Sequence, residues 1–127
     1  MQELDARTND LSYEIIGAAI EVHRALGAGL LESIYEDALC IELDDRHIPY
    51  ERQKDISLTY KGRQIGAHRL DLLVDDLVVV ELKAVQRLES VHTAQVMTYL
   101  KITNRRLGLL INFNMRVLKQ GIQRVIL

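Results

Sequence analysis

Hydrophobic residues in the first third of the chain recur every three to four positions, which is the spacing of one face of an α-helix. This spacing predicts a first helix that starts at the capping side chains of residues 8–10 and ends at Leu26, before the Gly-Ala-Gly at 27–29. A second helix is predicted over about residues 30–45, and Pro49 follows the end of its pattern. The chain is therefore expected to open with two consecutive helices.

After residue 49 the hydrophobic period changes to two, which is the period of a β-strand with one buried face. Strands are predicted at about 55–60 and 64–74, with a turn at Lys61-Gly62 between them. A third strand is predicted at 77–83, after a turn at 75–76, and it is apolar on both faces over most of its length. An apolar run of that kind is typical of the middle of a sheet.

The rest of the chain returns to a helical pattern and then to strands. A third helix is predicted over about residues 90–103, with Asn104 in a left-handed terminal position. Buried strands follow at 107–113 and 117–127. The predicted order is ααβββαββ, in a single α/β domain of residues 1–127 whose mixed sheet is flanked by helices.

Composition narrows the class of protein without identifying it. A chain of 127 residues that is 48% hydrophobic and 27% charged is expected to form one soluble globular domain. Cys40 is the only cysteine, so the sequence excludes an intramolecular disulfide and a cysteine-rich zinc site. No apolar run approaches the ~20 residues that span a bilayer, and the polar N-terminus is unlike a signal peptide. We therefore expect a cytoplasmic protein without membrane contact.

Charge is distributed unevenly along the chain, although the net charge is only −2. Residues 1–45 contain eleven acidic and two basic residues, whereas residues 46–127 contain fourteen basic and seven acidic ones. This asymmetry is compatible with a polyanion bound to the basic part of the chain. The alternative is that two oppositely charged halves attract each other.

The third predicted strand ends in Glu81-Leu82-Lys83, where the chemistry of one of its faces changes. With a period of two, Glu81 and Lys83 share the face of Val79, while the other face stays apolar. Charged groups at the end of a buried strand require partners or a function. Taken alone, a Glu-x-Lys pair favours a structural ion pair.

Asp71, ten residues before Glu81, adds a second carboxylate on the neighbouring strand. Two carboxylates on adjacent strands can hold one Mg²⁺, which prefers oxygen ligands and keeps several waters. The ammonium group of Lys83 would then orient or help to deprotonate a metal-bound water. A two-residue loop at 75–76 would place Asp71 opposite Val80 and turn it away from Glu81. The metal site therefore requires an odd loop or a bulge.

Two of the predicted helices carry polar residues that suit the same site. His92, Gln95 and Tyr99 stand at i, i+3 and i+7 and form one polar stripe on the third helix. The alternative is a solvated helix face, although Lys and Glu are more usual there. Glu32 lies in the first turn of the second helix, where its alternative role is to complement the helix dipole.

Together these residues resemble the motifs of the PD-(D/E)XK nuclease superfamily, in particular of its RecB-like branch. The motif residues are Asp71, Glu81-x-Lys83 and Gln95-x-x-x-Tyr99. The segment 22–35, which contains Gly29-x-x-Glu32-x-x-Tyr35, resembles the GxxExxY proteins, a family of small bacterial and archaeal proteins placed in that superfamily. The resemblance extends over nearly the whole chain and implies a restriction-endonuclease-like core.

The resemblance also implies roles for individual residues. Asp71 and Glu81 would be ligands of Mg²⁺ or Mn²⁺, and Lys83 would activate the attacking water. Glu32 would be a further catalytic acidic residue that reaches the metal through water. His23 would be another metal ligand by analogy with RecB-like nucleases, whereas a histidine on an apolar helix face is more often a hydrogen-bonded core residue.

The implied activity is metal-dependent hydrolysis of nucleic-acid phosphodiester bonds, with DNA expected in preference to RNA. Gln95, Tyr99 and His92 would support the site or contact the substrate backbone. The small size of the chain and its 5% aromatic content favour the alternative, a non-catalytic nucleic-acid-binding or protein-interaction module that retains the nuclease fold. A homodimer would enlarge the small binding surface.

Overall fold

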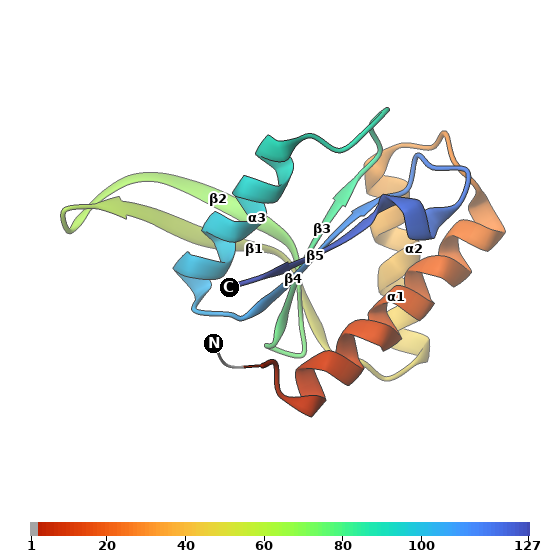
Figure 1. Ribbon diagram of the computed structural model, residues 1–127, viewed down its shortest axis with the longest axis horizontal. Coiled ribbons are helices and arrows are strands. Elements are labelled where there is room, and N and C mark those ends of the chain that lie inside the picture. The colour runs from red at the N-terminus through yellow and green to blue at the C-terminus, as the bar shows by residue number, and fades with distance from the viewer. Residues whose placement is uncertain (1–2) are drawn as a thin grey trace.

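The computed structural model describes residues 3–127 and shows an α/β fold in which helices lie on both faces of one five-stranded sheet (Figure 1). The elements follow the predicted order ααβββαββ. The helices are α1 (Ala6–Leu26), α2 (Glu32–Asp45) and α3 (Ser90–Thr103). The strands are β1 (Tyr50–Tyr60), β2 (Arg63–Val74), β3 (Val78–Lys83), β4 (Leu107–Asn112) and β5 (Ile122–Ile126), and a 3₁₀ turn, η1 (Leu118–Gly121), precedes β5. None of the helices in this part of the chain is long and apolar enough to cross a membrane.

Three predicted boundaries are wrong by several residues, for local reasons. Strand β1 starts at Tyr50 rather than at about residue 55, because its first residues pair with the end of β2. Helix α1 starts at Ala6, because Asp5 rather than residues 8–10 caps it by accepting the N–H of Thr8 at 2.7 Å. The last strand is shorter than the predicted 117–127, because the chain turns through η1 before β5 pairs with β4. None of these three shifts changes the order of the elements.

Strand β3 lies at the centre of the sheet, whose strand order is β1-β2-β3-β4-β5. The first three strands form an antiparallel meander, β3 and β4 are parallel, and β5 is antiparallel to β4. A parallel pair needs a crossover connection, and α3 provides it. Val78, Val79 and Val80 have no exposed surface, as the apolar run in this strand predicts.

The two faces of the sheet build two separate cores. Val78, Val80 and Leu82 belong to the larger core, which includes the apolar faces of α1 and α2. Val79 belongs to the smaller core, which includes the apolar face of α3. Figure 1 shows α1 and α2 on one side of the sheet and α3 on the other. Alternation along β3 therefore places Glu81 on the side of α3, two residues after Val79.

The loop between β2 and β3 contains three residues, 75–77, because Val74 pairs with Val78. Asp75 and Asp76 both adopt left-handed backbone conformations, with φ of 49° and 57°. The N–H of Leu77 closes the turn by donating to the carbonyl of Val74 at 2.9 Å. This odd loop meets the register condition, because the ladder that it sets places residue 71 opposite residue 81.

The β1–β2 hairpin extends beyond the rest of the sheet as a two-stranded arm, residues 54–70, which we call the ribbon (Figure 1). Within β2 only Leu72–Val74 pair with β3. At the base of the ribbon the β1–β2 ladder is interrupted at Gln53 and Asp71, and Gln53 has a left-handed φ of 49°. The sheet thus opens between β2 and β3 beside Asp71.

Close packing of α3 on β4 generates a first prediction. A Cβ atom on Gly108 would lie 2.5 Å from Cγ1 of Val96, a stiff β-branched side chain on α3. We expect Gly108→Ala to lower the free energy of unfolding by about 1–3 kcal/mol, because it overpacks the smaller core. Gly66→Ala is the matched control, since its Cβ would meet nothing closer than 3.7 Å. Equal urea midpoints for the two variants would contradict this packing.

Candidate functional site

Asp71 and Glu81 bridge the opening between β2 and β3 with their side chains. The N–H of Asp71 donates to Oε1 of Glu81 at 3.0 Å, and the N–H of Leu82 donates to Oδ2 of Asp71 at 2.8 Å. Each carboxylate therefore accepts a main-chain donor of the opposite strand. These side-chain bonds replace the ladder that ends at the Leu72–Val80 pair, and they hold the two acidic groups together.

The environment of this carboxylate pair opposes two negative charges. Glu81 is only 4% exposed, and burial raises the pKa of its carboxyl to about 8, with the negative charge of Asp71 adding to the rise. The N–H of Asp71 and the ammonium of Lys83 lower that pKa in part. The pair therefore attracts a proton or another positive charge.

Lys83 lies two residues beyond Glu81 on β3 and is half-buried. Its positive charge acts on Glu81 and also on Glu32, an exposed residue whose pKa is raised by partial desolvation, and there the lysine offsets part of that rise. Lys83 thus lies within electrostatic reach of acidic groups on two elements. The sequence pattern predicts Lys83 beside the carboxylate pair, and in the structure its charge acts on Glu81.

Glu32 is the first residue of α2 and reaches the same region from the other side of the opening. Its carboxylate lies near the backbone N–H of Ala84, and the charge of Asp71 contributes to the rise in its pKa. Glu32 and Asp71 line one hollow of about 620 Å³, which Leu31, Ser33, Glu36 and Gln53 complete. Within residues 3–127, however, no three His, Cys, Asp or Glu side chains lie close enough together to hold a metal ion.

Helix α3 contributes Tyr99 to the site. Tyr99 is 4% exposed, and burial raises the pKa of its phenol, with the charges of Glu81 and Asp71 adding to the effect. Its hydroxyl lies 3.3 Å from Nδ1 of His68 on the ribbon. Gln95 lies one helical turn before Tyr99 and is half-buried.

Two histidines from the sequence analysis have other partners. Nδ1 of His92 accepts the N–H of Glu89 at 2.9 Å and completes a capping box at the start of α3. Nε2 of His23 lies 2.7 Å from the carbonyl oxygen of Met115, to which it donates, and its ring lies beside Phe113. His23 therefore has the hydrogen-bonded arrangement that was the alternative to a ligand role.

Sequence reasoning missed the residues that support Asp71 from β1 and α2. Nε2 of Gln53 donates to Oε1 of Glu36 at 2.8 Å and reaches Oδ1 of Asp71 at 3.4 Å. Glu36 is buried and also accepts two hydrogen bonds from Arg52, at 2.8 and 3.1 Å. A bulge near Leu58 sets this register, because a regular two-residue hairpin would place Gln53 opposite residue 70. No local sequence signal marks that bulge.

Comparison with known proteins gives one match. A family model described as the PD-(D/E)XK nuclease superfamily matches residues 9–125, which run from the first turn of α1 into β5 and include all of the site residues above. No match to this chain is found among the curated proteins or among the solved structures. On the extent of the family match, and in agreement with the α/β fold, the chain belongs to the PD-(D/E)XK nuclease superfamily.

Proposed function

We propose that this protein is a nuclease that hydrolyses nucleic-acid phosphodiester bonds with Mg²⁺ or Mn²⁺ held by Asp71 and Glu81. The observation that carries the proposal is the pairing of Asp71 with the buried Glu81, in which each carboxylate accepts a main-chain N–H of the other strand, at 3.0 and 2.8 Å. Membership of the nuclease superfamily supports it. The finer placement among the GxxExxY proteins and the RecB-like branch rests on the sequence motifs.

The residues present fit a hard divalent cation. Two adjacent carboxylates, one of them almost fully buried, repel each other, and a cation between them would relieve both the repulsion and the cost of burial. Mg²⁺ keeps several waters, so two protein ligands suffice for a site of this kind. Glu32, across the hollow from Asp71, would bind one of those waters. His23 is left out of the ligand set, because its Nε2 is engaged by Met115.

The surrounding side chains would prepare the substrate and the water. A bound cation supplies a water of lowered pKa and neutralises charge on the phosphodiester. The ammonium of Lys83 would orient that water and favour its deprotonated form, because a positive charge stabilises hydroxide. Tyr99 and, one turn before it, Gln95 lie on α3, from which they would contact the substrate backbone. DNA is the substrate we expect first, with RNA as the alternative within the same chemistry.

One observation favours a non-catalytic module instead. Asp71 and Glu81 already have main-chain donors, so they satisfy each other without a metal. In that case Lys83 would neutralise a purely structural pair, and Glu81→Ala would leave it uncompensated at a cost of about 3 kcal/mol. Stability and cleavage measurements on the same variants distinguish the two functions.

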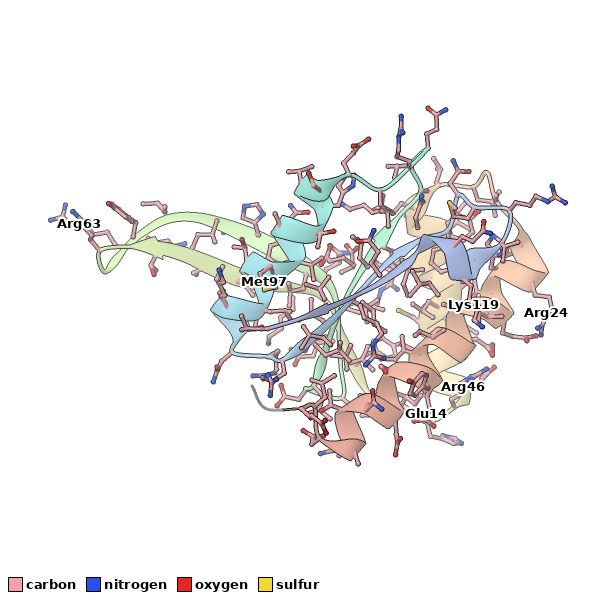
Figure 2. The ribbon with its side chains drawn as sticks, viewed as in Figure 1. Glu14, Arg24, Arg46, Arg63, Met97 and Lys119 are labelled. Atoms are coloured by element: carbon pink, nitrogen blue, oxygen red, sulfur yellow. The ribbon has the colours of Figure 1, made fainter. Side chains whose placement is uncertain are left out.

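Removal of the buried carboxylate tests the catalytic role. We expect Glu81→Ala to abolish metal-dependent cleavage of labelled DNA, because a single remaining carboxylate holds Mg²⁺ too weakly. Glu14→Ala is the control, since Glu14 is an exposed residue on α1 (Figure 2). Cleavage by Glu81→Ala at the rate of the control variant would rule out the proposed site.

Lys83 should affect turnover and leave metal affinity largely unchanged. We expect Lys83→Ala to lower kcat by about 10²–10⁴-fold, while the Kd for Mn²⁺ in a calorimetric titration changes little, since the lysine acts on the water. Lys101→Ala, an exposed substitution on α3, should change neither quantity. Loss of metal binding in Lys83→Ala would show that the lysine has a structural role.

The raised pKa of Glu81 predicts a pH dependence of stability in metal-free protein. Because the folded pKa, about 8, lies above the ordinary 4.5, the folded state binds this proton more tightly than the unfolded state. The resulting stabilisation, on the order of a few kcal/mol, is complete below pH 4.5 and is lost as the pH rises through 8. In urea titrations with a chelator, Glu81→Gln should flatten this profile.

Addition of Mg²⁺ completes that experiment. The cation should restore stability to the wild type above pH 8 and leave Glu81→Gln unchanged, because only the wild type presents both charges. A large loss of stability in Glu81→Gln, with no effect of Mg²⁺ on the wild type, would favour the non-catalytic module.

A further inference from the structure

We propose that the face of the ribbon turned towards α3 is a nucleic-acid-binding surface, which carries the substrate strand away from the Asp71–Glu81 site towards the tip at Tyr60 and Arg63. The inference rests on the proposed function for the identity of the ligand. It adds a second contact region outside the carboxylate pair.

The ribbon starts at the candidate site and leads away from it. Paired residues run from Lys54–Leu70 at the base to Tyr60–Arg63 at the tip. The seven residues of β1 in the ribbon, 54–60, rise about 3.3 Å each and give an arm of roughly 20 Å. Figure 1 shows this arm projecting past the rest of the sheet, and Figure 2 places Arg63 at its far end. A hairpin of this kind has no core of its own beyond its base, so its side chains are available to a ligand.

The register defines which side chains share the α3-facing side. The pairs Ile56–His68, Leu58–Gly66 and Tyr60–Arg63 succeed each other at every second residue of β1, and residues two apart on a strand share a face. Ile56 packs in the smaller core with α3, which identifies this face. His68, opposite Ile56, lies 3.3 Å from the Tyr99 hydroxyl. The face is therefore continuous from the site to the tip.

Basic residues at the base of the ribbon form ion pairs, whereas those at its tip form none within residues 3–127. Lys54 pairs with Glu51 at 2.8 Å, and Arg69 pairs with Asp55 at 3.0 Å. Residues 56–70 contain no acidic side chain. Lys61 and Arg63 form no ion pair with any residue of the described chain. Two free cations at the end of an arm provide the complementary charge for phosphates.

An exposed aromatic ring accompanies these cations. Tyr60 is 62% exposed, and Nζ of Lys61 lies 5.4 Å from the centre of its ring. Aromatic rings beside basic residues stack on bases and track a phosphate backbone in proteins that bind nucleic acids. A two-stranded ribbon also has the width that the major groove of a duplex admits. Charge and shape thus both indicate a nucleic acid as the occupant.

A second copy of the chain is the competing occupant, because β1 is an edge strand and Ile65 on β2 is 68% exposed. Edge pairing is disfavoured by a bulge and by lysines along the edge, and this ribbon has a register shift after Leu58 and lysines at 54 and 61. These features discourage strand pairing while leaving the basic tip accessible.

The test compares Arg63→Glu with Lys119→Glu, which makes the same charge change at an exposed position on the opposite side of the molecule (Figure 2). Fluorescence anisotropy with a labelled DNA strand, in chelator so that nothing is cleaved, should show about tenfold weaker binding for Arg63→Glu. The slope of log K against log salt concentration should become smaller by about one for that variant alone, because one phosphate contact is lost. Tyr60→Ala should weaken binding by about fivefold or more without changing the slope.

A cleavage assay with Mg²⁺ separates the inference from the proposed function. Arg63→Glu should raise KM for a long strand and leave cleavage of a dinucleotide unchanged, because the dinucleotide spans the site without reaching the tip.

Equal affinities and salt slopes for Arg63→Glu and Lys119→Glu would overturn the inference even if both variants cleave DNA. Salt-dependent binding that is lost in Arg63→Glu supports the inference even if the wild type cleaves nothing, an outcome that would reject only the proposed function. If light scattering shows that the wild type is a dimer and Arg63→Glu a monomer, and if both bind DNA equally well, the ribbon binds a second copy of the chain and the inference is overturned.

Discussion

The exchange of hydrogen bonds between Asp71 and Glu81 is the interaction on which the rest of this structure depends. The main-chain N–H groups of Asp71 and Leu82 each donate to a carboxylate of the opposite strand, at 3.0 and 2.8 Å. Strands β2 and β3 stay joined at this point while their backbones separate. The same bonds keep two acidic groups together where Glu81 is buried. Without a positive charge nearby, this arrangement lowers the free energy of unfolding. Such a cost is typical of a functional site.

Besides β2 and β3, two helices contribute residues to that opening, because β3 is central in the sheet. Glu32 lies in the first turn of α2 and reaches the opening from there. Lys83 lies on β3 itself, two residues after Glu81. Helix α3, as the crossover between parallel strands, packs across the other face and presents Tyr99. The separation of β2 from β3 also releases the ribbon, so that one local departure from regular pairing both creates the site and directs an arm away from it.

Most of the fold could be predicted from periodicity, because the helical and strand patterns of this chain change sharply at Pro49 and at the Glu81–Lys83 end of β3. The site was predictable in composition and less so in geometry. A face shared by Asp71 and Glu81 depended on an odd loop, and the left-handed conformations of Asp75 and Asp76 that provide it are not specified by those residue types alone. The position of Gln53 beside Asp71 could not be predicted for a related reason, since it depends on a bulge several residues away. Helical spacing also selected His92, whose Nδ1 in the structure caps α3 by accepting the N–H of Glu89.

We propose that Asp71 and Glu81 hold one divalent cation between them. Anomalous diffraction from crystals of the wild-type protein soaked in Mn²⁺ tests this proposal, because it locates the metal and its ligands without reference to activity. We expect a single Mn²⁺ between β2 and β3, bound by oxygens of both carboxylates at about 2.1 Å, with waters completing the shell towards Glu32. Mn²⁺ bound elsewhere, with the Asp71 and Glu81 carboxylates still donated to by the N–H groups of Leu82 and Asp71 and free of metal, would contradict it.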